Sequence, residues 1–125
     1  MFGKNFIMVG NATEFLDPVF SSGVTLALES GAKSADLIIQ EFKGEEVDWQ
    51  SEYQDYMMIG VNVFREYVEA WYDGRLQSIL FSKTLTADKI ERKVVSVLSG
   101  YVWDKRNMFV HSPRESVNAI YKALT

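Results

Sequence analysis

The order of apolar and polar positions along the chain predicts one short strand followed by helices. Phe6-Ile7-Met8-Val9 is an apolar run that ends at Gly10, a pattern typical of a buried strand in a parallel sheet. No second strand pattern follows, so we expect its pairing partners to lie outside these 125 residues. The prediction is a mainly α-helical chain with one short N-terminal strand and four or five helices.

The first helix is predicted from about residue 20 to residue 42, with Gly44 as the glycine that follows its C-terminus. Every fourth position of this helix is small, which predicts close approach to a neighbouring backbone. These small residues are Gly23, Ala27, Gly31 and Ala35. Larger apolar residues extend the same surface, namely Val24, Leu28, Ile38 and Ile39 together with Ala32.

Asp48 is suited to cap a second, long helix that closes near Asp73-Gly74. Aromatic residues recur along this helix at helical spacings: Trp49, Tyr53, Tyr56, Tyr67 and Trp71. Such a stripe indicates either a packed core or the lining of a substrate cavity, and core is the commoner use. Residues 75–83 are consistent with a short third helix.

Two further helices are predicted towards the C-terminus. Thr84 or Thr86 is suited to cap the first, whose apolar face continues to Val102. Ser112 and Glu115 have the spacing of a capping box for the second, with Pro113 at its first helical position.

Composition narrows the possible functions. The chain is 47% hydrophobic and 24% charged, as expected of a folded domain, and its net charge of −4 argues against general nucleic-acid binding. It contains no cysteine, which excludes disulfides and thiolate chemistry and fits a cytoplasmic location. His111 is the only histidine and is expected to face solvent or cap a helix, so no metal site is predicted. No apolar run approaches the ~20 residues of a membrane span.

Residues 9–31 are the most informative segment, because they have the pattern of a strand end, a tight loop and a helix start. A loop that leads into a helix N-terminus presents free backbone N–H groups and the positive end of the helix dipole to an electron-rich ligand. Gly10 permits close backbone approach and Pro18 stiffens the loop. Ser21, Ser22 and Gly23 are small enough for a flat ring to lie against them. The alternative is ordinary strand–turn–helix packing without a ligand.

The motif Asp17-Pro18-Val19-Phe20-Ser21-Ser22-Gly23-Val24 resembles the second flavin-contacting motif of FAD-dependent monooxygenases and halogenases. It is most similar to the halogenase-like and geranylgeranyl-reductase-like branches of that superfamily. Trp71-Tyr72-Asp73-Gly74 also resembles the helical C-terminal part of halogenase-related flavoproteins. The resemblance covers roughly residues 5 to 83. It implies the C-terminal portion of an α/β, Rossmann-like FAD-binding fold.

The same resemblance assigns cofactor-binding residues and no catalytic residue. Gly10 and Asn11 would lie beside the ribityl–pyrophosphate part of FAD. Pro18, Ser21, Ser22, Gly23 and Val24 would line the isoalloxazine edge, and in halogenases the backbone near Ser22 and Gly23 would also lie close to the halide. The family carries Asp where this chain has Asn11, which is a neutral and weaker hydrogen-bond acceptor.

The sequence lacks the Gly-x-Gly-x-x-Gly dinucleotide fingerprint and the Trp-x-Trp-x-Ile-Pro motif of halogenases. We therefore expect residues 1–125 to be one C-terminal flavoprotein segment, inactive and unable to retain FAD alone. Within it, residues 1–44 would belong to the FAD-binding domain and residues 45–125 to a C-terminal helical region.

The expected partners follow from this interpretation. They are the missing N-terminal half of the flavoprotein, a small organic substrate, and NAD(P)H or a flavin reductase as the source of electrons. A homodimer is expected of the chain alone, because its strand has no partner. The competing hypothesis is a stand-alone helical module that binds another protein and has no catalytic activity.

Overall fold

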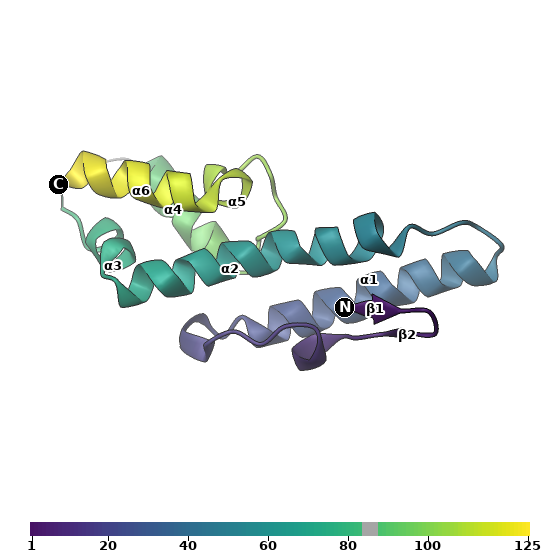
Figure 1. The fold of residues 1–125 in the computed structure, drawn as a ribbon. Coiled ribbons are helices and arrows are strands. Elements are labelled where there is room, and N and C mark those ends of the chain that lie inside the picture. Colours follow the sequence, from purple (N-terminus) through teal and green to yellow (C-terminus); the bar gives the residue numbers. More distant parts are fainter. Residues whose placement is uncertain (84–87) are drawn as a thin grey trace. The chain divides into compact units, whose positions relative to one another are not determined.

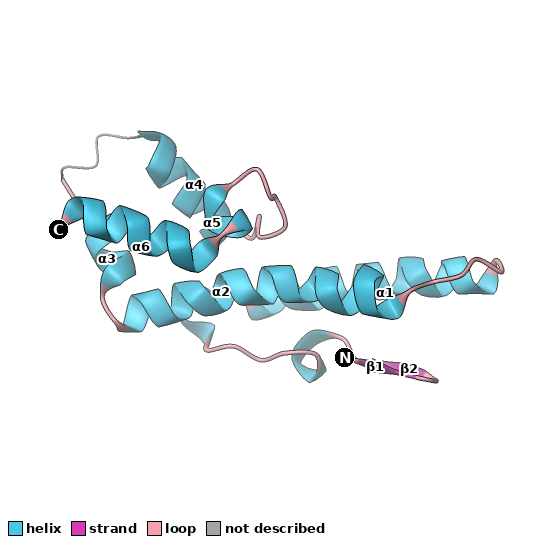
Figure 2. Ribbon diagram, turned by 45° about the horizontal axis from the view of Figure 1, so that its top comes forward, coloured by secondary structure: helices cyan, strands magenta, loops and turns pink. Residues whose placement is uncertain are grey.

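The computed structural model describes residues 1–83 and 88–125 and is mainly helical, as the sequence predicts (Figures 1 and 2). Its strands are β1 (Phe2–Gly3) and β2 (Phe6–Ile7), and its α-helices are α1 (Gly23–Phe42), α2 (Tyr56–Tyr72), α3 (Arg75–Leu80), α4 (Asp88–Leu98), α5 (Met108–His111) and α6 (Pro113–Leu124). The chain divides into two compact units, Met1–Val61 (unit 1) and Asn62–Thr125 (unit 2). None of the described helices is long and apolar enough to cross a membrane.

The N-terminal strand has a partner within the chain, so the prediction that it is unpaired is wrong. β1 and β2 form a two-stranded antiparallel hairpin with the register Phe2–Ile7 and Gly3–Phe6, turned by residues 4–5. The strand is also less buried than predicted, because Phe6 is 60% and Val9 42% exposed. A two-residue strand is too short to show a hydrophobic period, and for this reason the pattern of the sequence did not reveal β1.

The first predicted helix is confirmed as α1, and its C-terminus is a Schellman motif. Gly44 adopts a left-handed conformation with φ of +81°. Its N–H donates to the carbonyl of Glu41 at 2.9 Å, and the N–H of Glu45 donates to that of Gln40 at 3.0 Å. These two bonds satisfy carbonyls that the end of a helix would otherwise leave without partners, and glycine adopts the required φ without steric cost.

The faces of α1 are not arranged as the sequence pattern predicts. The residues that α1 buries are Leu26, Ser30, Ser34 and Leu37. Val24 and Leu28 are 69% and 70% exposed, and Ile39 is 50% exposed. Residues four apart differ by about 40° around a helix. The row of small residues therefore winds around the helix, and Gly23, Ala27 and Ala35 are all exposed.

Asp48 caps the start of the second predicted helix, as expected. The carboxylate of Asp48 accepts hydrogen bonds from the backbone N–H groups of Gln50 at 3.1 Å and Ser51 at 3.3 Å. Its own N–H donates to Glu52 Oε2 at 2.8 Å. The first turns form a π-helical segment, Gln50–Asp55, which continues directly into α2. Gly74, with φ of +88°, follows the end of α2 and confirms the predicted closure.

Unit 2 buries a continuous set of apolar side chains from α2 to α6. They include Val63, Phe64, Tyr67, Leu76, Ile79, Val94, Val97, Val102, Phe109 and Val117. The rings of Tyr67 and Phe109 meet edge to face, with centroids 6.2 Å apart. The predicted caps at Thr84 and Thr86 lie outside the described residues.

The capping box predicted at the last helix does not form, although Pro113 does occupy the first turn of α6. The N–H of Ser112 already donates to the carbonyl of Met108 at 2.9 Å and closes α5, so it is not available to Glu115. The side chain of Ser112 makes no capping bond and instead pairs with Nδ1 of the exposed His111 at 2.9 Å. The α5–α6 junction is too short for a separate cap, because one residue ends one helix and begins the next.

An ionic cluster centred on Glu66 joins three helices of unit 2. The carboxylate of Glu66 is 4% exposed and accepts hydrogen bonds from Arg75 Nη1 at 3.0 Å and Arg114 Nε at 2.8 Å. Arg75 also donates to Asn118 at 2.7 Å, and Arg114 donates to Glu69 at 2.7 Å. These contacts link α2 to α3 and α6 and satisfy the buried carboxylate.

Candidate functional site

The candidate site begins at Gly10, where the backbone turns sharply after the hairpin. Gly10 has φ of +59° and opens a 3₁₀ turn, Gly10–Ala12, that is closed by a 3.0 Å bond from the N–H of Thr13 to the carbonyl of Gly10. A side chain is disfavoured at this φ, which explains a glycine at this position. The loop also lies directly on α1, since a Cβ atom at position 10 would be 3.7 Å from Cβ of Ala27.

A second 3₁₀ turn, Pro18–Phe20, leads into α1. Asp17 caps this turn by accepting the N–H of Val19 at 3.1 Å, and Pro18 fixes φ at its first position. Ser21 follows with φ of +53°, the only left-handed conformation among the described non-glycine residues. Such a conformation is uncommon outside glycine, and strain of this kind gathers at ligand sites.

The N-terminus of α1 keeps its backbone donors uncapped. Ser22 is the N-cap residue and is 3% exposed, but its side chain makes no capping hydrogen bond. The first turn holds no acidic residue, and Gly23 and Val24 are exposed. The N–H groups of the first turn have no partner within a helix, and the helix dipole adds positive potential at this end. This arrangement fits an electron-rich ligand.

The structure brings the two halves of the predicted site together at Asn11 and Gly23. A Cβ atom at position 23 would meet Asn11 Oδ1 at 3.9 Å, an ordinary contact distance. Pro18 and Ser21 lie exposed along the turn that joins these halves, and Val24 is exposed one residue beyond. Asn11 and Gly23, twelve positions apart in sequence, thus lie in one exposed strip with Pro18, Ser21 and Val24.

Three hydroxyl groups that the sequence analysis did not assign to the site hold the loop in place. Ser30 Oγ accepts the N–H of Gly10 at 2.9 Å. The carbonyl of Met8 accepts two hydroxyl groups, that of Tyr53 at 2.5 Å and that of Thr13 at 2.8 Å. Burial raises the pKa of Tyr53, which therefore keeps its proton as a donor. Ser30 and Tyr53 are both fully buried.

A second polar group in unit 1 joins α1 to the start of α2. The hydroxyl of Tyr56 donates to Glu29, and Lys33 Nζ lies 4.7 Å from the centroid of the Tyr56 ring. Burial, followed by the hydrogen bond and the negative charge of Glu29, raises the pKa of Tyr56 well above its usual value.

The predicted aromatic stripe divides between core and surface positions. Tyr53 and Tyr67 are fully buried, which confirms the core interpretation for these two residues. Tyr56, Trp49 and Trp71 are partly exposed. Trp49 Nε1 donates to Glu41 Oε1 at 2.7 Å, and its ring lies edge to face with that of Tyr53.

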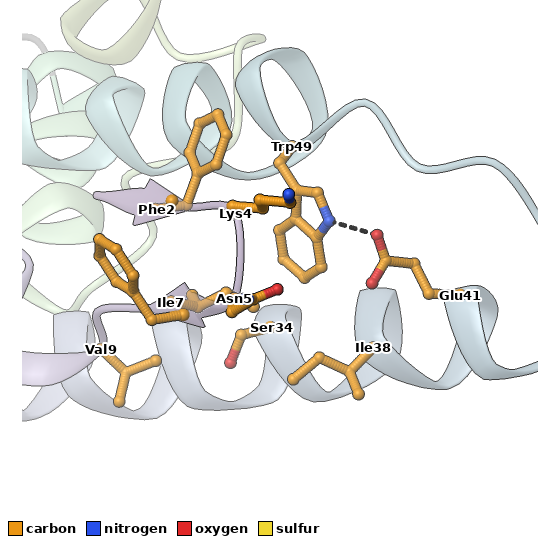
Figure 3. A pocket seen from close by; sticks show the side chains of 11 residues that line it. Phe2, Lys4, Asn5, Ile7, Val9, Ser34, Ile38, Glu41 and Trp49 are labelled. Carbon is orange, nitrogen blue, oxygen red and sulfur yellow. Dashed lines mark hydrogen bonds between the residues drawn. The ribbon is translucent and has the colours of Figure 1, made fainter.

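A cavity of about 820 Å³ lies between the hairpin and the middle of α1 (Figure 3). It is lined by residues of the hairpin and by Val9, Ser34, Ile38, Glu41 and Trp49, and by none of the seven residues that the sequence predicts for the flavin. Its lining is mainly apolar, and its two charged residues, Lys4 and Glu41, come from the hairpin turn and α1. We place the candidate site at the loop, because there the Gly10 turn lies beside the start of α1, a long helix whose N-cap side chain makes no capping bond.

Comparison with known proteins connects this geometry to flavoproteins. No family model matches the sequence. The chain is 30% identical over 121 residues to a 1H-pyrrole-2-carbonyl peptidyl-carrier-protein chlorinase of Pseudomonas fluorescens, a match that covers 94% of this chain and 26% of the relative. It is 28% identical over 105 residues to the corresponding brominase of Pseudoalteromonas luteoviolacea, covering 82% of this chain and 25% of the relative.

A solved structure supports the same relationship. A flavoprotein/dehydrogenase of Cytophaga hutchinsonii matches with a TM-score of 0.93 and 46% identity, over 98% of this chain and 30% of that protein. A flavin-dependent halogenase of Armillaria mellea is 44% identical over 43 residues. The chain spans about a quarter of the length of the two bacterial halogenases that it matches. It is thus homologous to a portion of the flavin-dependent halogenases and related flavoproteins.

Proposed function

We propose that this chain supplies the flavin-contacting loop and helix of an FAD-dependent oxidoreductase. The observation that carries the proposal is the uncapped N-terminus of α1 beside the Gly10 turn, with Asn11 and Gly23 in adjacent positions. This arrangement lies in a segment that matches flavoproteins over nearly the whole chain. A helix N-terminus with small residues provides donors to an electron-rich ring at little conformational cost.

Each residue of the strip has a separate proposed role. Asn11 accepts a hydrogen bond from a ribityl hydroxyl, and Gly10 gives the backbone the turn that brings Asn11 there. The N–H groups at the start of α1 stabilise negative charge on the ring, while Gly23 leaves room for its edge. Pro18, Ser21 and Val24 shape the surface on which the ring lies, and the buried Ser22 contributes backbone at the start of the helix. FAD, when bound, would supply the redox chemistry.

We propose an oxidation of a small organic substrate as the reaction class, with electrons from NAD(P)H or a flavin reductase. The relatives named as a chlorinase, a brominase and a flavin-dependent halogenase favour a halogenase-like reaction. The relative named as a flavoprotein/dehydrogenase is 46% identical and is not named as a halogenase. For this reason the proposal also includes monooxygenase and reductase reactions. The segment alone would hold only part of the cofactor site and would be inactive without the rest.

The partner that we propose is the remaining portion of such a flavoprotein, and α1 offers a surface for it. The outer face of α1 consists of Val24, Leu28, Gly31, Ala35, Ile39 and Phe42, and its four larger side chains are between 50% and 88% exposed. An apolar stripe of this extent is typical of an interface. About 70–75% of each of these relatives lies outside the match with this chain. We propose that the corresponding portion of the flavoprotein covers this face of α1.

A chimera tests the cofactor assignment. In it, this chain replaces the matching 30% of the Cytophaga hutchinsonii flavoprotein. We expect the chimera to purify with FAD, seen as absorbance near 450 nm, and the 125-residue chain to remain colourless after FAD is added and removed by gel filtration. Gly23→Val in the chimera should raise the dissociation constant for FAD at least about tenfold, a loss of roughly 1.4 kcal/mol of binding free energy, and lower FAD occupancy accordingly.

Glu46→Ala, at an exposed position outside the site, is the control and should keep the FAD of the unchanged chimera. The fold should tolerate Gly23→Val, because a Cβ atom at position 23 meets nothing closer than 3.9 Å. A loss of FAD at unchanged thermal stability would therefore report on the ligand. Equal FAD occupancy in the Gly23→Val and Glu46→Ala chimeras would contradict the assignment.

The proposed partner surface is tested with a charge on the outer face of α1. Leu28→Glu should reduce the yield of FAD-loaded chimera severalfold, because a carboxylate would be buried in an apolar contact. Phe81→Glu, at a residue that is 74% exposed in unit 2, is the matched control and should leave the yield unchanged. Equal yields would argue against this surface. A dimer of the 125-residue chain that Leu28→Glu dissociates would instead assign the face to a second copy.

A further inference from the structure

Two buried hydroxyl groups hold the backbone of the candidate flavin loop from outside the loop itself. Ser30 lies on α1 twenty residues beyond Gly10, and its side chain is fully buried. Ser30 Oγ accepts the N–H of Gly10 at 2.9 Å and donates to the carbonyl of Ala27 at 3.1 Å. Its donor and one of its acceptor positions are thus both used, and its position is fixed by the helix.

Tyr53 acts from the start of the second long helix. Its hydroxyl donates to the carbonyl of Met8 at 2.5 Å across a separation of 45 residues, and its ring is fully buried. The two bonds therefore hold the backbone immediately before and after Val9. Between them they determine where the chain enters the Gly10 turn and, in consequence, where Asn11 meets Gly23.

We propose that Ser30 and Tyr53 are positioning residues for the flavin loop, which orient the Gly10–Asn11 backbone towards the N-terminus of α1 without touching the cofactor. The expected effect on FAD binding rests on the proposed function, whereas the two hydrogen bonds that hold the loop are present in this chain alone. A small error in the placement of a binding group is sufficient to weaken a site, and buried hydrogen bonds are a common means of preventing it. Both residues lie within the residues 5 to 83 that the resemblance covers, but outside the string Asp17–Val24 to which it assigns flavin contacts.

Ser34 provides a matched control for Ser30. It lies one helical turn further along α1, is 6% exposed, and its hydroxyl donates to the carbonyl of Gly31 at 3.0 Å. It resembles Ser30 in burial and in its bond to the helix backbone. Among the described residues, however, its hydroxyl bonds to the helix and not to the loop. Tyr67→Phe in unit 2 is the corresponding control for Tyr53→Phe, because Tyr67 is equally buried.

The first measurement uses the 125-residue chain and no flavin. Hydrogen exchange should show the amide of Gly10 exchanging about tenfold faster or more in Ser30→Ala than in the unchanged chain, because its hydrogen bond is lost. Ser34→Ala should leave the exchange rate of this amide unchanged. The two variants are compared under conditions in which their free energies of unfolding are equal. Unchanged protection of the Gly10 amide in Ser30→Ala would overturn the proposal.

The second measurement uses the chimera described above. Ser30→Ala and Tyr53→Phe should each raise the dissociation constant for FAD about tenfold, as expected for the loss of one buried hydrogen bond. Ser34→Ala and Tyr67→Phe should change it less than about twofold, and Ser30→Thr, which keeps the hydroxyl, should recover most of the affinity. Equal affinities in Ser30→Ala and Ser34→Ala would overturn the positioning role.

The Gly23→Val chimera separates failure of this inference from failure of the proposed function. If Gly23→Val loses FAD while Ser30→Ala and Tyr53→Phe retain it, the site assignment holds and the positioning role is wrong. If Gly23→Val retains FAD, the flavin assignment itself is wrong. Faster exchange at Gly10 in Ser30→Ala would then show that Ser30 orders a loop that serves another purpose.

Discussion

Residues 62–125 bury most of their aromatic and branched side chains among their own helices, with exceptions such as Phe81 and Tyr101, whereas residues 1–61 leave many such side chains exposed. In unit 1, Phe15, Leu28 and Phe42 are 67%, 70% and 88% exposed. In unit 2, Phe64, Leu76 and Phe109 are 2% exposed or less. These phenylalanines and leucines thus have opposite surroundings, so residue type does not account for the difference.

The polar contacts show the same division. Unit 2 places a charge, Glu66, in its interior and satisfies it with Arg75 and Arg114. Unit 1 uses buried hydroxyl groups, Ser30 and Tyr53, to hold a loop whose outer side faces solvent. We infer that unit 2 is stabilised mainly by its own core, and that unit 1 is shaped for a ligand and for a further protein surface.

The largest expected effect compares the same substitution in the two units. Phe109→Ala should lower the free energy of unfolding by about 3–5 kcal/mol, because it removes a fully buried ring and its contact with Tyr67. Phe42→Ala should change it by less than about 0.5 kcal/mol in the 125-residue chain, because Phe42 is exposed. Urea unfolding followed by circular dichroism measures both. Similar losses in the two variants would remove the distinction between the units.

The ionic cluster gives a smaller effect within unit 2. Glu66→Gln should lower the free energy of unfolding by about 1–3 kcal/mol. The amide is uncharged and has one acceptor oxygen, whereas the carboxylate uses one oxygen for each arginine. The matched variant is Glu69→Gln, whose carboxylate is 47% exposed and should contribute no more than about 1 kcal/mol. A Glu69→Gln variant as unstable as Glu66→Gln would show that burial of Glu66 does not determine the strength of the cluster.

Local signals in the sequence were sufficient for several features of this fold. Gly44 after α1, Asp48 before the second helix and Pro113 in the first turn of α6 occupy the predicted positions. Each of these depends on backbone geometry within a few residues. The flavoprotein resemblance was also local, because the short motif around Gly23 carries it, and the comparisons confirm that relationship.

Features that depend on distant contacts were not predicted. Ser30 and Tyr53 are separated from the loop backbone by 20 and 45 residues, and Glu66 from Arg114 by 48. The spacing of Leu26, Ser30, Ser34 and Leu37 was the available signal, since it places two serines on the buried face of α1. The hairpin was missed for a different reason, because a strand of two residues carries almost no pattern.

The smallest expected effect concerns the exposed helix start in unit 1. The hydrogen bond from the Ser51 hydroxyl, together with backbone N–H groups, holds the pKa of Asp48 below its ordinary value of 3.8. A folded-state pKa below the unfolded one gives stability that is present above about pH 4 and is lost as the pH falls through the lower value. Asp48→Asn removes this titration and keeps a capping oxygen.

The difference in unfolding free energy between the unchanged chain and Asp48→Asn should therefore be constant from neutral pH down to about pH 5 and should narrow as the pH falls below about 4. Ser51→Ala removes the largest cause of the lowered pKa, so the same narrowing should be weaker in that background. Urea titrations at several pH values measure these differences. A difference that stays constant below about pH 4 would mean that the cap stabilises both protonation states equally, and the start of the second helix would then not contribute to the pH dependence of unit 1.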